Sequence, residues 1–304
     1  MRRIAVLVNP TAGGGRGFRV AEQAVTYLEQ AGLTVRRLQG RDSDEAAALA
    51  GQAVEGGSDA LVTVGGDGLV HLALQVLRGT ETPLGVIPAG TGNDVARLLG
   101  IDRKDARAAA DVIVAGHTRA LDLADVSGTG VVTVVATGFD SKVSERANGM
   151  TWPRGQMRYN IATLLELRVF EPIRYALELD GAPYELDAML VAIGNGPSYG
   201  GGLRICEGAV IDDGLLDVAI IKPVSKLELV RVYPRLFTGT HVRHPAYERH
   251  RVHSVSVAAP GIVAFGDGER LGPLPITVSS VPSAMRVFAP GGSGQRDRGL
   301  TPVR

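Results

Sequence analysis

The 304-residue chain has few cysteines, few aromatic residues and no excess of charge of either sign. Its single Cys206 cannot form an internal disulfide, which fits a reducing compartment. No His or Asp motif nearby indicates a nucleophile, so we expect Cys206 to be a small buried hydrophobic residue. The 32 basic and 32 acidic residues give a formal net charge of zero, and this balance does not indicate a nucleic-acid partner.

Long hydrophobic runs are also missing. No stretch approaches the ~20 apolar residues that a membrane span needs. Only a five-residue apolar run separates Arg2 and Arg3 from Asn9-Pro10, which does not fit a signal peptide. We therefore expect a soluble protein whose contact with any membrane is peripheral.

The balanced charge hides a local cationic strip. Residues 222–253 contain seven Lys or Arg against two Glu, with four of the six histidines. Such a strip could meet anionic lipid headgroups or phosphates. The alternative is an ordinary solvated loop and helix face. A second segment, 158–170, has an apolar stripe flanked by Arg, which favours either core packing or contact with a membrane.

Two periodicities alternate through the first 125 residues. Helical patterns follow short apolar runs that are typical of strands. We expect strands at 4–8, 34–38, 60–64, 84–88 and 120–126, and helices at 18–31, 43–55, 69–77, 93–99 and 105–115. This alternation predicts an α/β domain with a parallel sheet covered on both faces.

After Val126, runs typical of strands dominate and are separated by Gly, Pro and Asp turns. They lie at 131–136, 175–180, 184–194, 216–221, 254–258 and 262–265, with helical patterns at 155–170 and 225–238. This pattern predicts an antiparallel sandwich or barrel. We therefore divide the chain into an α/β domain (1–125), a β-rich domain (126–290) whose last strand at 286–289 could belong to either domain, and a flexible tail (291–304).

Three glycine-rich loops each follow a predicted strand of the first domain. They are NPTAG at 9–13, GGDG at 65–68 and PAGTGND at 88–94. In an open parallel sheet such loops lie at the carboxyl ends of the strands, where ligands bind. Glycines let backbone N–H groups approach phosphate oxygens. One loop would mean little, because tight turns need glycine anyway, but three at equivalent positions predict a phosphate-binding site. The common nucleotide motifs G-x-x-x-x-G-K-[ST] and G-x-G-x-x-G are absent.

Asp67 is unexpected inside a phosphate loop because its charge repels phosphate. Its position makes sense if the carboxylate faces Mg²⁺, or a hydroxyl that must lose a proton. The alternative is an N-cap for the helix that starts near Leu69.

Two further acidic turns lie in the second domain. Asp212, Asp213 and Asp217 surround Gly214, and such carboxylates suit a hard cation or mark a hairpin turn. Glu269 ends the sequence GDGE at 266–269. It is either a general base for a hydroxyl or an exposed turn residue, and the spacing alone favours the turn.

Taken together, these motifs resemble the diacylglycerol kinase catalytic family, which is shared with sphingosine kinases and bacterial soluble lipid kinases. The resemblance runs from Ile4 to about Pro290. It rests on NPTAG, GGDG and PAGTGND, and on TGFD at 137–140, DDGLLDV at 212–218, DGE at 267–269 and VFAP at 287–290. Both the order and the spacing of the motifs agree with the family.

The resemblance implies a fold similar to NAD kinases and phosphofructokinases, with ATP in a cleft between two domains. It also implies that Glu269 is the proton acceptor and Asp67 the essential loop residue. Mg²⁺ would be held by the Asp213 side chain and the backbone carbonyls of Val210 and Leu215. The candidate nucleotide-binding residues are Asn9, Pro10, Thr11, Ala12, Gly13, Gly65, Gly66, Asp67, Gly68, Leu69, Val70, His71, Thr91 and Asn93.

The chain departs from the family after the GGDG loop. Leu69, His71 and Leu72 stand where the family commonly has Thr, Asn and Glu, and near Gly40 the chain lacks a Thr that often contacts the nucleotide. These departures concern nucleotide affinity and donor preference, and leave Asp67 and Glu269 in place.

The resulting hypothesis is an ATP-dependent lipid kinase that converts diacylglycerol to phosphatidic acid. We expect it in the cytoplasm, in peripheral contact with the inner face of the membrane, and leave homo-oligomerisation open. The alternatives are a kinase for sphingosine, ceramide or NAD, and a non-catalytic nucleotide-binding regulator.

Overall fold

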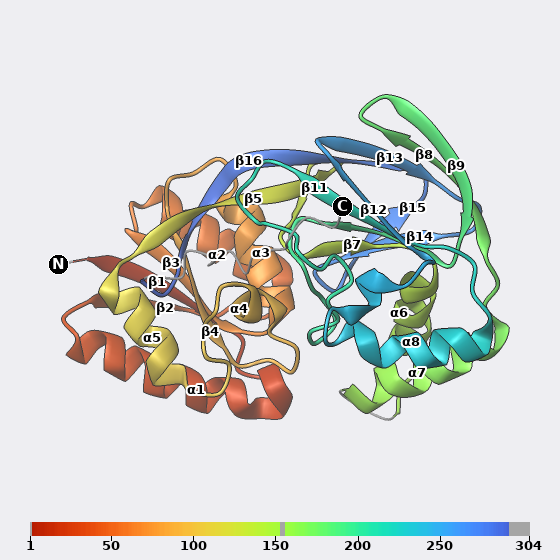
Figure 1. Ribbon diagram of the computed structural model, residues 1–304. Helices are drawn as coiled ribbons and strands as arrows, with labels where there is room; N and C mark the ends of the chain where they lie inside the picture. The colour runs from red at the N-terminus through yellow and green to blue at the C-terminus, as the bar shows by residue number, and fades with distance from the viewer. Residues whose placement is uncertain (1, 153–155, 292–304) are drawn as a thin grey trace.

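The computed structural model describes residues 2–152 and 156–291, which form two sheets and eight α-helices (Figure 1). The N-terminal half is built on four parallel strands in the spatial order β2-β1-β3-β4. They are β1 (Arg3–Val8), β2 (Thr34–Leu38), β3 (Ala60–Gly65) and β4 (Leu84–Pro88). Strands β1, β3 and β4 are almost completely buried, as expected for a parallel sheet between helices.

Five helices accompany these strands, at α1 (Ala12–Gln30), α2 (Ser43–Glu55), α3 (Asp67–Leu77), α4 (Asp94–Leu98) and α5 (Ala106–Ala115). Helix α2 shows why such segments are readable from sequence. Asp42 caps it by accepting the Glu45 N–H at 2.9 Å, and Ala46, Ala50 and Ala53 form one buried face at helical spacing.

Two long strands connect the halves. Strand β5 (Thr118–Val126) runs antiparallel to β16 (Ile276–Phe288), and β16 also pairs in parallel with β4 at Val287 and Leu84. The last strand therefore returns to the N-terminal half after the chain has built the other one. Figure 1 shows β16 crossing the top of the molecule.

The C-terminal half is an antiparallel sandwich. Its first sheet continues from β16 through β13 (Ser254–Ala258), β8 (Ile173–Leu179) and β9 (Ala182–Ala188), with β6 (Thr129–Val131) beside β5. Its second sheet has the order β12 (Tyr247–Val252), β11 (Leu216–Ile221), β10 (Leu190–Gly194), β7 (Val134–Ala136), β14 (Val263–Gly266) and β15 (Glu269–Pro273). The predicted fold class, an α/β domain followed by a β sandwich, is confirmed.

The second sheet is covered on both faces. One face packs against the first sheet through residues such as Tyr175, Ile193 and Val218. The other packs against a helical layer made of α6 (Phe139–Gly149), α7 (Gln156–Val169), α8 (Lys226–Leu236) and the 3₁₀ helix η1 (Thr240–Arg243). Cys206 is fully buried in this layer, as expected.

Several boundaries differ from the sequence-based expectation. Helix α6 was not predicted, because few of its side chains are apolar. The run 131–136 divides into β6 and β7 because the Val132 and Thr133 N–H groups turn away to the Asp267 carboxylate. The run 184–194 divides because β9 and β10 belong to different sheets.

Two expectations concern the chain end and the membrane. The predicted tail at 291–304 lies, apart from Gly291, outside the described residues. Within 2–152 and 156–291, no helix combines the length and apolar character needed to cross a bilayer.

Candidate active site

The three glycine-rich loops meet backbone to backbone at the carboxyl ends of β1, β3 and β4. The Ala89 N–H donates to the Gly65 carbonyl at 2.8 Å, and the Asn9 N–H to the Val64 carbonyl at 3.0 Å. A Cβ on Gly90 would lie 2.5 Å from the Gly66 Cα, and one on Gly13 would overlap the Ala89 carbonyl oxygen. These glycines are therefore required by the close approach of the loops.

Polar side chains fix the shape of these loops. Asn93, in the left-handed region at φ 54°, both accepts from and donates to the backbone of Gly90 at 3.0 Å. Asn9 accepts the Thr11 N–H at 3.1 Å and its hydroxyl at 2.8 Å. Asn9, Thr11 and Asn93, which we expected to bind the nucleotide, make hydrogen bonds that hold the loops themselves in shape.

Asp67 is the first residue of α3, but its carboxylate caps a different helix. Oδ1 accepts the N–H groups of Asp94 and Val95, at 2.7 and 3.3 Å, at the start of α4. The alternative of a cap for its own helix is wrong, since the N-cap of α3 is Gly66. Burial, and then the charge of Asp94, raise the pKa of Asp67 to about 6, although these backbone donors oppose the shift.

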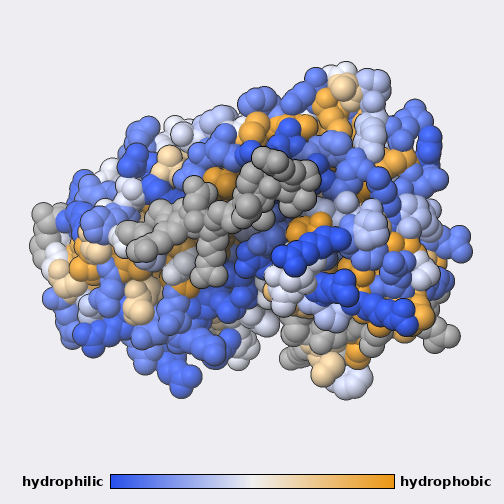
Figure 2. All heavy atoms as spheres, viewed as in Figure 1, coloured by the Kyte–Doolittle hydropathy of each residue, from blue (hydrophilic) through white to orange (hydrophobic). Residues whose placement is uncertain are grey.

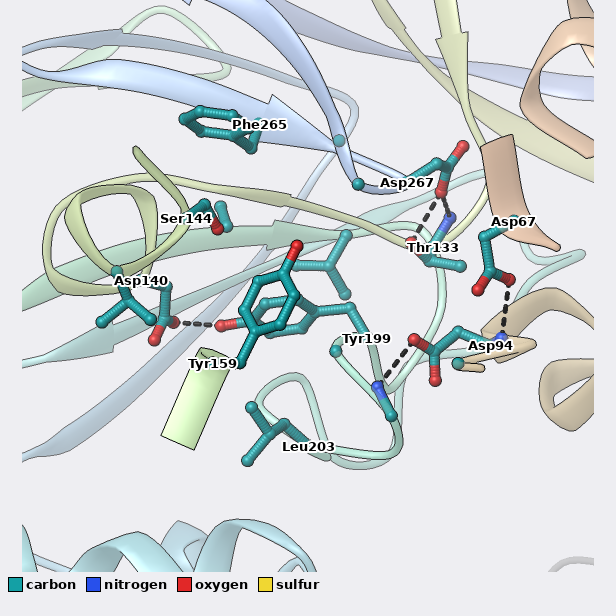
Figure 3. A pocket seen from close by; sticks show the side chains of 18 of the residues that line it. Asp67, Asp94, Thr133, Asp140, Ser144, Tyr159, Tyr199, Leu203, Phe265 and Asp267 are labelled. Carbon is teal, nitrogen blue, oxygen red and sulfur yellow. Dashed lines mark hydrogen bonds between the residues drawn. The ribbon is translucent and has the colours of Figure 1, made fainter. Parts of the chain in front are cut away.

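Asp94 carries this connection into the C-terminal half. Its Oδ2 accepts the Gly201 N–H at 2.8 Å, and its Oδ1 lies 3.5 Å from Nε of Arg97. Figure 3 shows Asp67 and Asp94 side by side and joined by a hydrogen bond. The GGDG loop is thus tied to a loop of the sandwich through two carboxylates.

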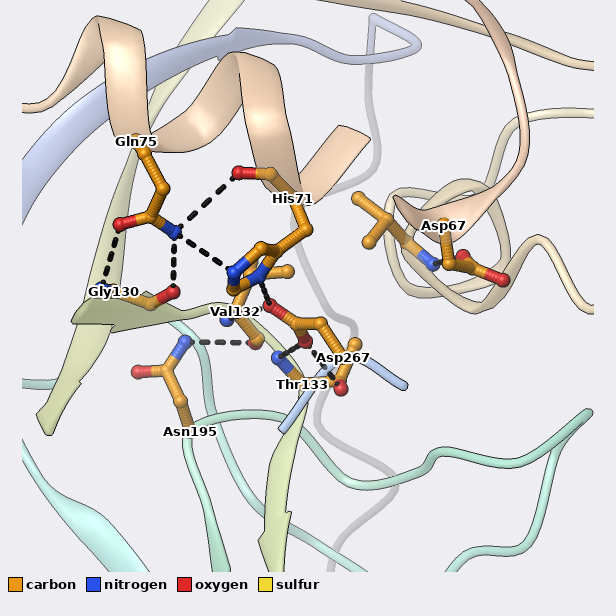
Figure 4. Close-up of polar contacts among 9 residues, drawn as sticks. Asp67, His71, Gln75, Gly130, Val132, Thr133, Asn195 and Asp267 are labelled. Atoms are coloured by element: carbon orange, nitrogen blue, oxygen red, sulfur yellow. Dashed lines mark hydrogen bonds and ion pairs between the residues drawn. The ribbon is translucent and has the colours of Figure 1, made fainter. Parts of the chain in front are cut away.

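Asp267 ties the halves together a second time. It forms the β14–β15 turn with Gly268, at φ 51° and 89°, as a two-residue hairpin requires. Its carboxylate accepts the Thr133 N–H at 2.9 Å, the Thr133 hydroxyl at 2.6 Å and the Val132 N–H at 3.0 Å. Nδ1 of His71, on α3, lies 3.3 Å from the same carboxylate (Figure 4).

The Asp267 turn brings Glu269 to the GGDG loop. Glu269 begins β15 opposite Gly266 and is exposed. A Cβ on Gly68 would lie 3.1 Å from Oε1 of Glu269, so this carboxylate lies directly beside the loop. Glu269 therefore fits both interpretations of its motif, because it follows a hairpin turn and also lies beside the predicted phosphate site.

A cavity of about 310 Å³ lies between the halves. Its polar side includes Asp67, Thr91, Gly92, Asp94, Asp267 and Gly268. The remaining wall is mostly apolar and includes Val134, Ala136, Val143, Tyr159, Leu203, Tyr233 and Phe265. Figure 3 shows Asp67 and Asp94 on one side of the cavity, and Asp140 and Phe265 on the other.

Asp140 and Tyr199 form a hydrogen-bonded pair in the apolar part of the cavity (Figure 3). Burial raises the pKa of Asp140 to about 6, against the hydrogen bond from Tyr199. Burial and then the Asp140 charge raise the pKa of Tyr199 well above its ordinary value. We assigned no role to Asp140 or Asp94 from sequence, although TGFD and PAGTGND contain them, and no motif singled out Tyr199.

The candidate Mg²⁺ residues Val210, Asp213 and Leu215 lie outside the lining of this cavity. One carboxylate and two carbonyls are suitable ligands for a hard cation. However, Oδ1 of Asp213 accepts the Leu215 N–H at 3.0 Å, and Oδ2 is paired with Arg251. A cation at this turn would have to replace Arg251 on Oδ2. Across the described ranges, no cluster of three or more His, Cys, Asp or Glu is arranged to hold a metal.

The remaining candidate nucleotide residues contribute little through their side chains. Leu69 packs over Gly65, and Val70 is 3% exposed in the core. The Pro10 carbonyl accepts the Phe18 N–H at 3.2 Å, and the Ala12 N–H donates to Asn9 at 3.2 Å. The Leu69 and Val70 N–H groups both donate to the Gly66 carbonyl, and Pro10 has no N–H, so these residues shape the loops.

The sequence and the fold agree with one family. A model of the diacylglycerol kinase catalytic domain matches residues 3–126, and one of the YegS C-terminal NAD kinase beta sandwich-like domain matches 133–289.

Individual relatives agree with these models. Diacylglycerol kinase of Mycobacterium tuberculosis (strain ATCC 25618 / H37Rv) is 43% identical over 294 residues, 95% of each chain. That of Bacillus subtilis (strain 168) is 28% identical over 280 residues, 90% of this chain and 92% of the relative. The crystal structure of a diacylglycerol kinase from Bacillus anthracis str. Sterne shares the fold at a TM-score of 0.74 and 20% identity, over 95% of this chain and 97% of that one. The chain belongs to the diacylglycerol kinase family.

Proposed function

We propose that the protein transfers the γ-phosphate of ATP to the hydroxyl of diacylglycerol and so forms phosphatidic acid. The observation that supports this best is the cavity, because its lining joins residues of two glycine-rich loops, 65–68 and 88–94, to a mostly apolar wall. The loops suit a phosphate donor, and the wall suits an acceptor with a hydrocarbon part. Membership in the family supports the kinase chemistry.

The nucleotide phosphates would bind where the three loops converge. Backbone N–H groups at the start of α3, at Gly13 and at Thr91 and Gly92 would donate to phosphate oxygens, helped by the partial positive charge at a helix N-terminus. Phosphoryl transfer depends mainly on positioning and on charge stabilisation. Rigid loops fixed by Asn9, Asn93 and the glycine contacts supply the positioning.

Mg²⁺, when bound, neutralises negative charge on phosphates or holds a loop in place. Asp213, Val210 and Leu215 would hold such an ion outside the cavity, where its effect would be on the turn that precedes β11. In that position the ion would stabilise the arrangement of the sandwich. The carboxylates that line the cavity are those of Asp67, Asp94, Asp140 and Asp267.

Glu269 would accept the proton of the attacking hydroxyl. Its carboxylate lies beside Gly68, and the Asp267 turn that carries it is fixed from both halves. Asp67 would keep α4 and the loop at 88–94 in position through its bonds to Asp94 and Val95. Its pKa of about 6 leaves it mostly ionised at neutral pH, in position to interact with a cation or a hydroxyl.

The apolar wall would take the part of the lipid next to its reactive hydroxyl. A volume of about 310 Å³ is near the lower end of the ~300–1,000 Å³ typical of ligand pockets. We therefore expect the glycerol end and the start of an acyl chain to enter, while the rest of the lipid stays outside.

The test is ATP turnover with four acceptors, diacylglycerol, sphingosine, ceramide and NAD, each assayed with the parent and with Glu269→Gln. Turnover that is fastest with diacylglycerol and is lost in the variant supports the proposal. Preference for another acceptor would replace diacylglycerol in it. Nucleotide binding without turnover on any acceptor would favour a non-catalytic regulator.

A further inference from the structure

Exposed large apolar side chains are concentrated at one end of the C-terminal half. Ten such residues occur in the described parts of the chain, and nine of them lie between positions 152 and 242. These nine are Trp152, Met157, Tyr159, Leu165, Val169, Leu227, Val230, Phe237 and Val242. Scattered single apolar residues are ordinary on a protein surface, but a concentration of them indicates an interaction site.

The helices α7 and α8 that bear most of them are neighbours. They lie side by side at the lower edge of the C-terminal half in Figure 1, and Tyr233 of α8 contacts Thr163 of α7. In Figure 2, apolar and strongly hydrophilic residues are mixed over this end of the molecule.

Helix α8 has apolar residues on both of its sides. Leu229, Val232 and Leu236 are buried against the sandwich. On the outer side, Leu227 is 61% exposed and Val230 is 49% exposed. A solvent-facing side would normally be polar, so these residues indicate contact with something apolar.

Three arginines accompany this outer side. Arg231, Arg235 and Arg243 are exposed, and none of them takes part in a salt bridge within the described part of the chain. The nearest acid on α8, Glu228, is paired with His244 at 3.0 Å. We define the α8 face as Leu227, Val230, Phe237 and Val242 with these three arginines.

The cationic strip at 222–253 therefore divides into a part whose charges are paired and a part whose charges are not. On β11 and β12 its charges are compensated, since Arg249 pairs with Asp217 and Arg251 with Asp213. Lys222 pairs with Glu248 at 2.6 Å. The uncompensated arginines lie on α8 and the following turns. The face is therefore both apolar and positively charged.

The same helices form part of the cavity wall. Arg158, Tyr159 and Thr163 of α7 line the cavity, and so does Tyr233 of α8. A lipid that enters only in part would extend past these two helices. The exposed apolar residues therefore lie on the elements that the remainder of the lipid would meet.

We propose that the α8 face docks on a bilayer that contains anionic lipid. This inference rests on the proposed lipid acceptor. Leu227, Val230 and Phe237 would enter the headgroup region, and the arginines would contact lipid phosphates, as in other helices that lie in the plane of a membrane.

The test is sedimentation of the full chain with vesicles of phosphatidylcholine, alone or mixed with phosphatidylglycerol. Leu227→Gln with Val230→Gln should weaken binding to both kinds of vesicle. Arg231→Gln with Arg235→Gln should weaken binding only to the anionic vesicles, by about fivefold for each arginine. That binding should also fall with added salt.

Two variants of the N-terminal half serve as matched controls. Arg19→Gln with Arg36→Gln removes the same number of exposed arginines, and Phe18→Gln removes a side chain that is 55% exposed. Neither should change vesicle binding. Equal loss in the controls, or unchanged binding in the α8 variants, would overturn the proposal. Thermal melting should show that each variant is folded.

Turnover of a short-chain diacylglycerol dissolved as monomers separates docking from catalysis. The α8 variants should keep the parent's rate on this substrate and lose rate only on diacylglycerol in vesicles. Vesicle binding through α8 without turnover on any lipid would refute the proposed function alone. Turnover of the short-chain lipid with no α8-dependent vesicle binding would refute the docking alone.

Discussion

Asp67 accepts the backbone N–H of Asp94 at 2.7 Å, so one acidic residue caps the helix that begins with another. Asp94 in turn accepts the Gly201 N–H of the C-terminal half. Two carboxylates therefore lie close together in the cavity, and burial together with the charge of Asp94 acts on Asp67. The backbone donors hold the pair in place, and the charge of Asp67 is the feature that can be titrated.

The raised pKa of Asp67 predicts a pH-dependent cost of folding. A carboxyl with a pKa of about 6 in the folded chain, against an ordinary 3.8, contributes stability below pH 4 that is lost as the pH rises through about 6. Asp67→Asn removes this dependence, which is on the order of 3 kcal/mol for such a shift. Urea denaturation from pH 4 to pH 8 should show the variant gaining stability over the parent across this range. A difference that does not change with pH would contradict the prediction.

Glu269 is predicted to act in the chemical step. Glu269→Gln should lower kcat by ~10²–10⁴, the usual range for a general base. Because the carboxylate lies at the edge of the GGDG loop, the variant should bind ATP with little change. Steady-state kinetics and ATP titration measure the two effects. A variant that keeps near-parental kcat would remove Glu269 from this role.

Asp267 is predicted to be a structural anchor. Asparagine tolerates the left-handed backbone of this turn, so Asp267→Asn alters the carboxylate and keeps the turn. With four donors facing it, the variant should lose about 2–4 kcal/mol of stability. His71→Asn, which removes one partner, should cost about 1 kcal/mol or less. Denaturation of both variants measures the difference, and equal losses would show that His71 carries the anchor.

Arg251 is predicted to compete with a cation for Asp213. Arg251→Gln frees one carboxylate oxygen, so Mg²⁺ should raise the Tm of this variant more than that of the parent. Asp213→Asn should abolish the Mg²⁺-dependent rise in Tm. The readout is thermal melting over a Mg²⁺ titration. A rise that Asp213→Asn leaves intact would place the ion elsewhere.

The apolar wall is predicted to bind the acceptor and not the nucleotide. Val143→Phe adds bulk from α6 into the cavity and should raise KM for diacylglycerol about tenfold, as for ~1.4 kcal/mol of lost binding. KM for ATP should stay near its parental value. The two constants are compared by varying each substrate at saturating levels of the other. A parallel rise in both would indicate a general distortion of the site.

Local patterns predicted much of the fold. Strand β2 at Thr34–Leu38 and helix α2 at Ser43–Glu55 have the bounds that their periodicity indicates. Helix α6 was not predicted because few of its side chains are apolar. Phe139, Val143 and Ala147 supply most of its buried apolar surface, which is too little to show a helical pattern in the sequence. The buried face of α6 is defined by what packs against it in the helical layer.

The GGDG loop and its two flanking glycine loops were readable from sequence because glycine is needed wherever backbones approach closely or turn sharply. The partners of the acids were not readable. Asp67 caps α4, Asp267 joins His71 to Thr133, and Glu269 reaches Gly68 from about 200 residues away in sequence. Of these, the contacts of Asp267 with His71 and of Glu269 with Gly68 require the two halves to come together. The sequence by itself determined the glycine-rich loops and the family. The tertiary structure decided which groups each carboxylate contacts, because partners distant in sequence come together only in the folded chain.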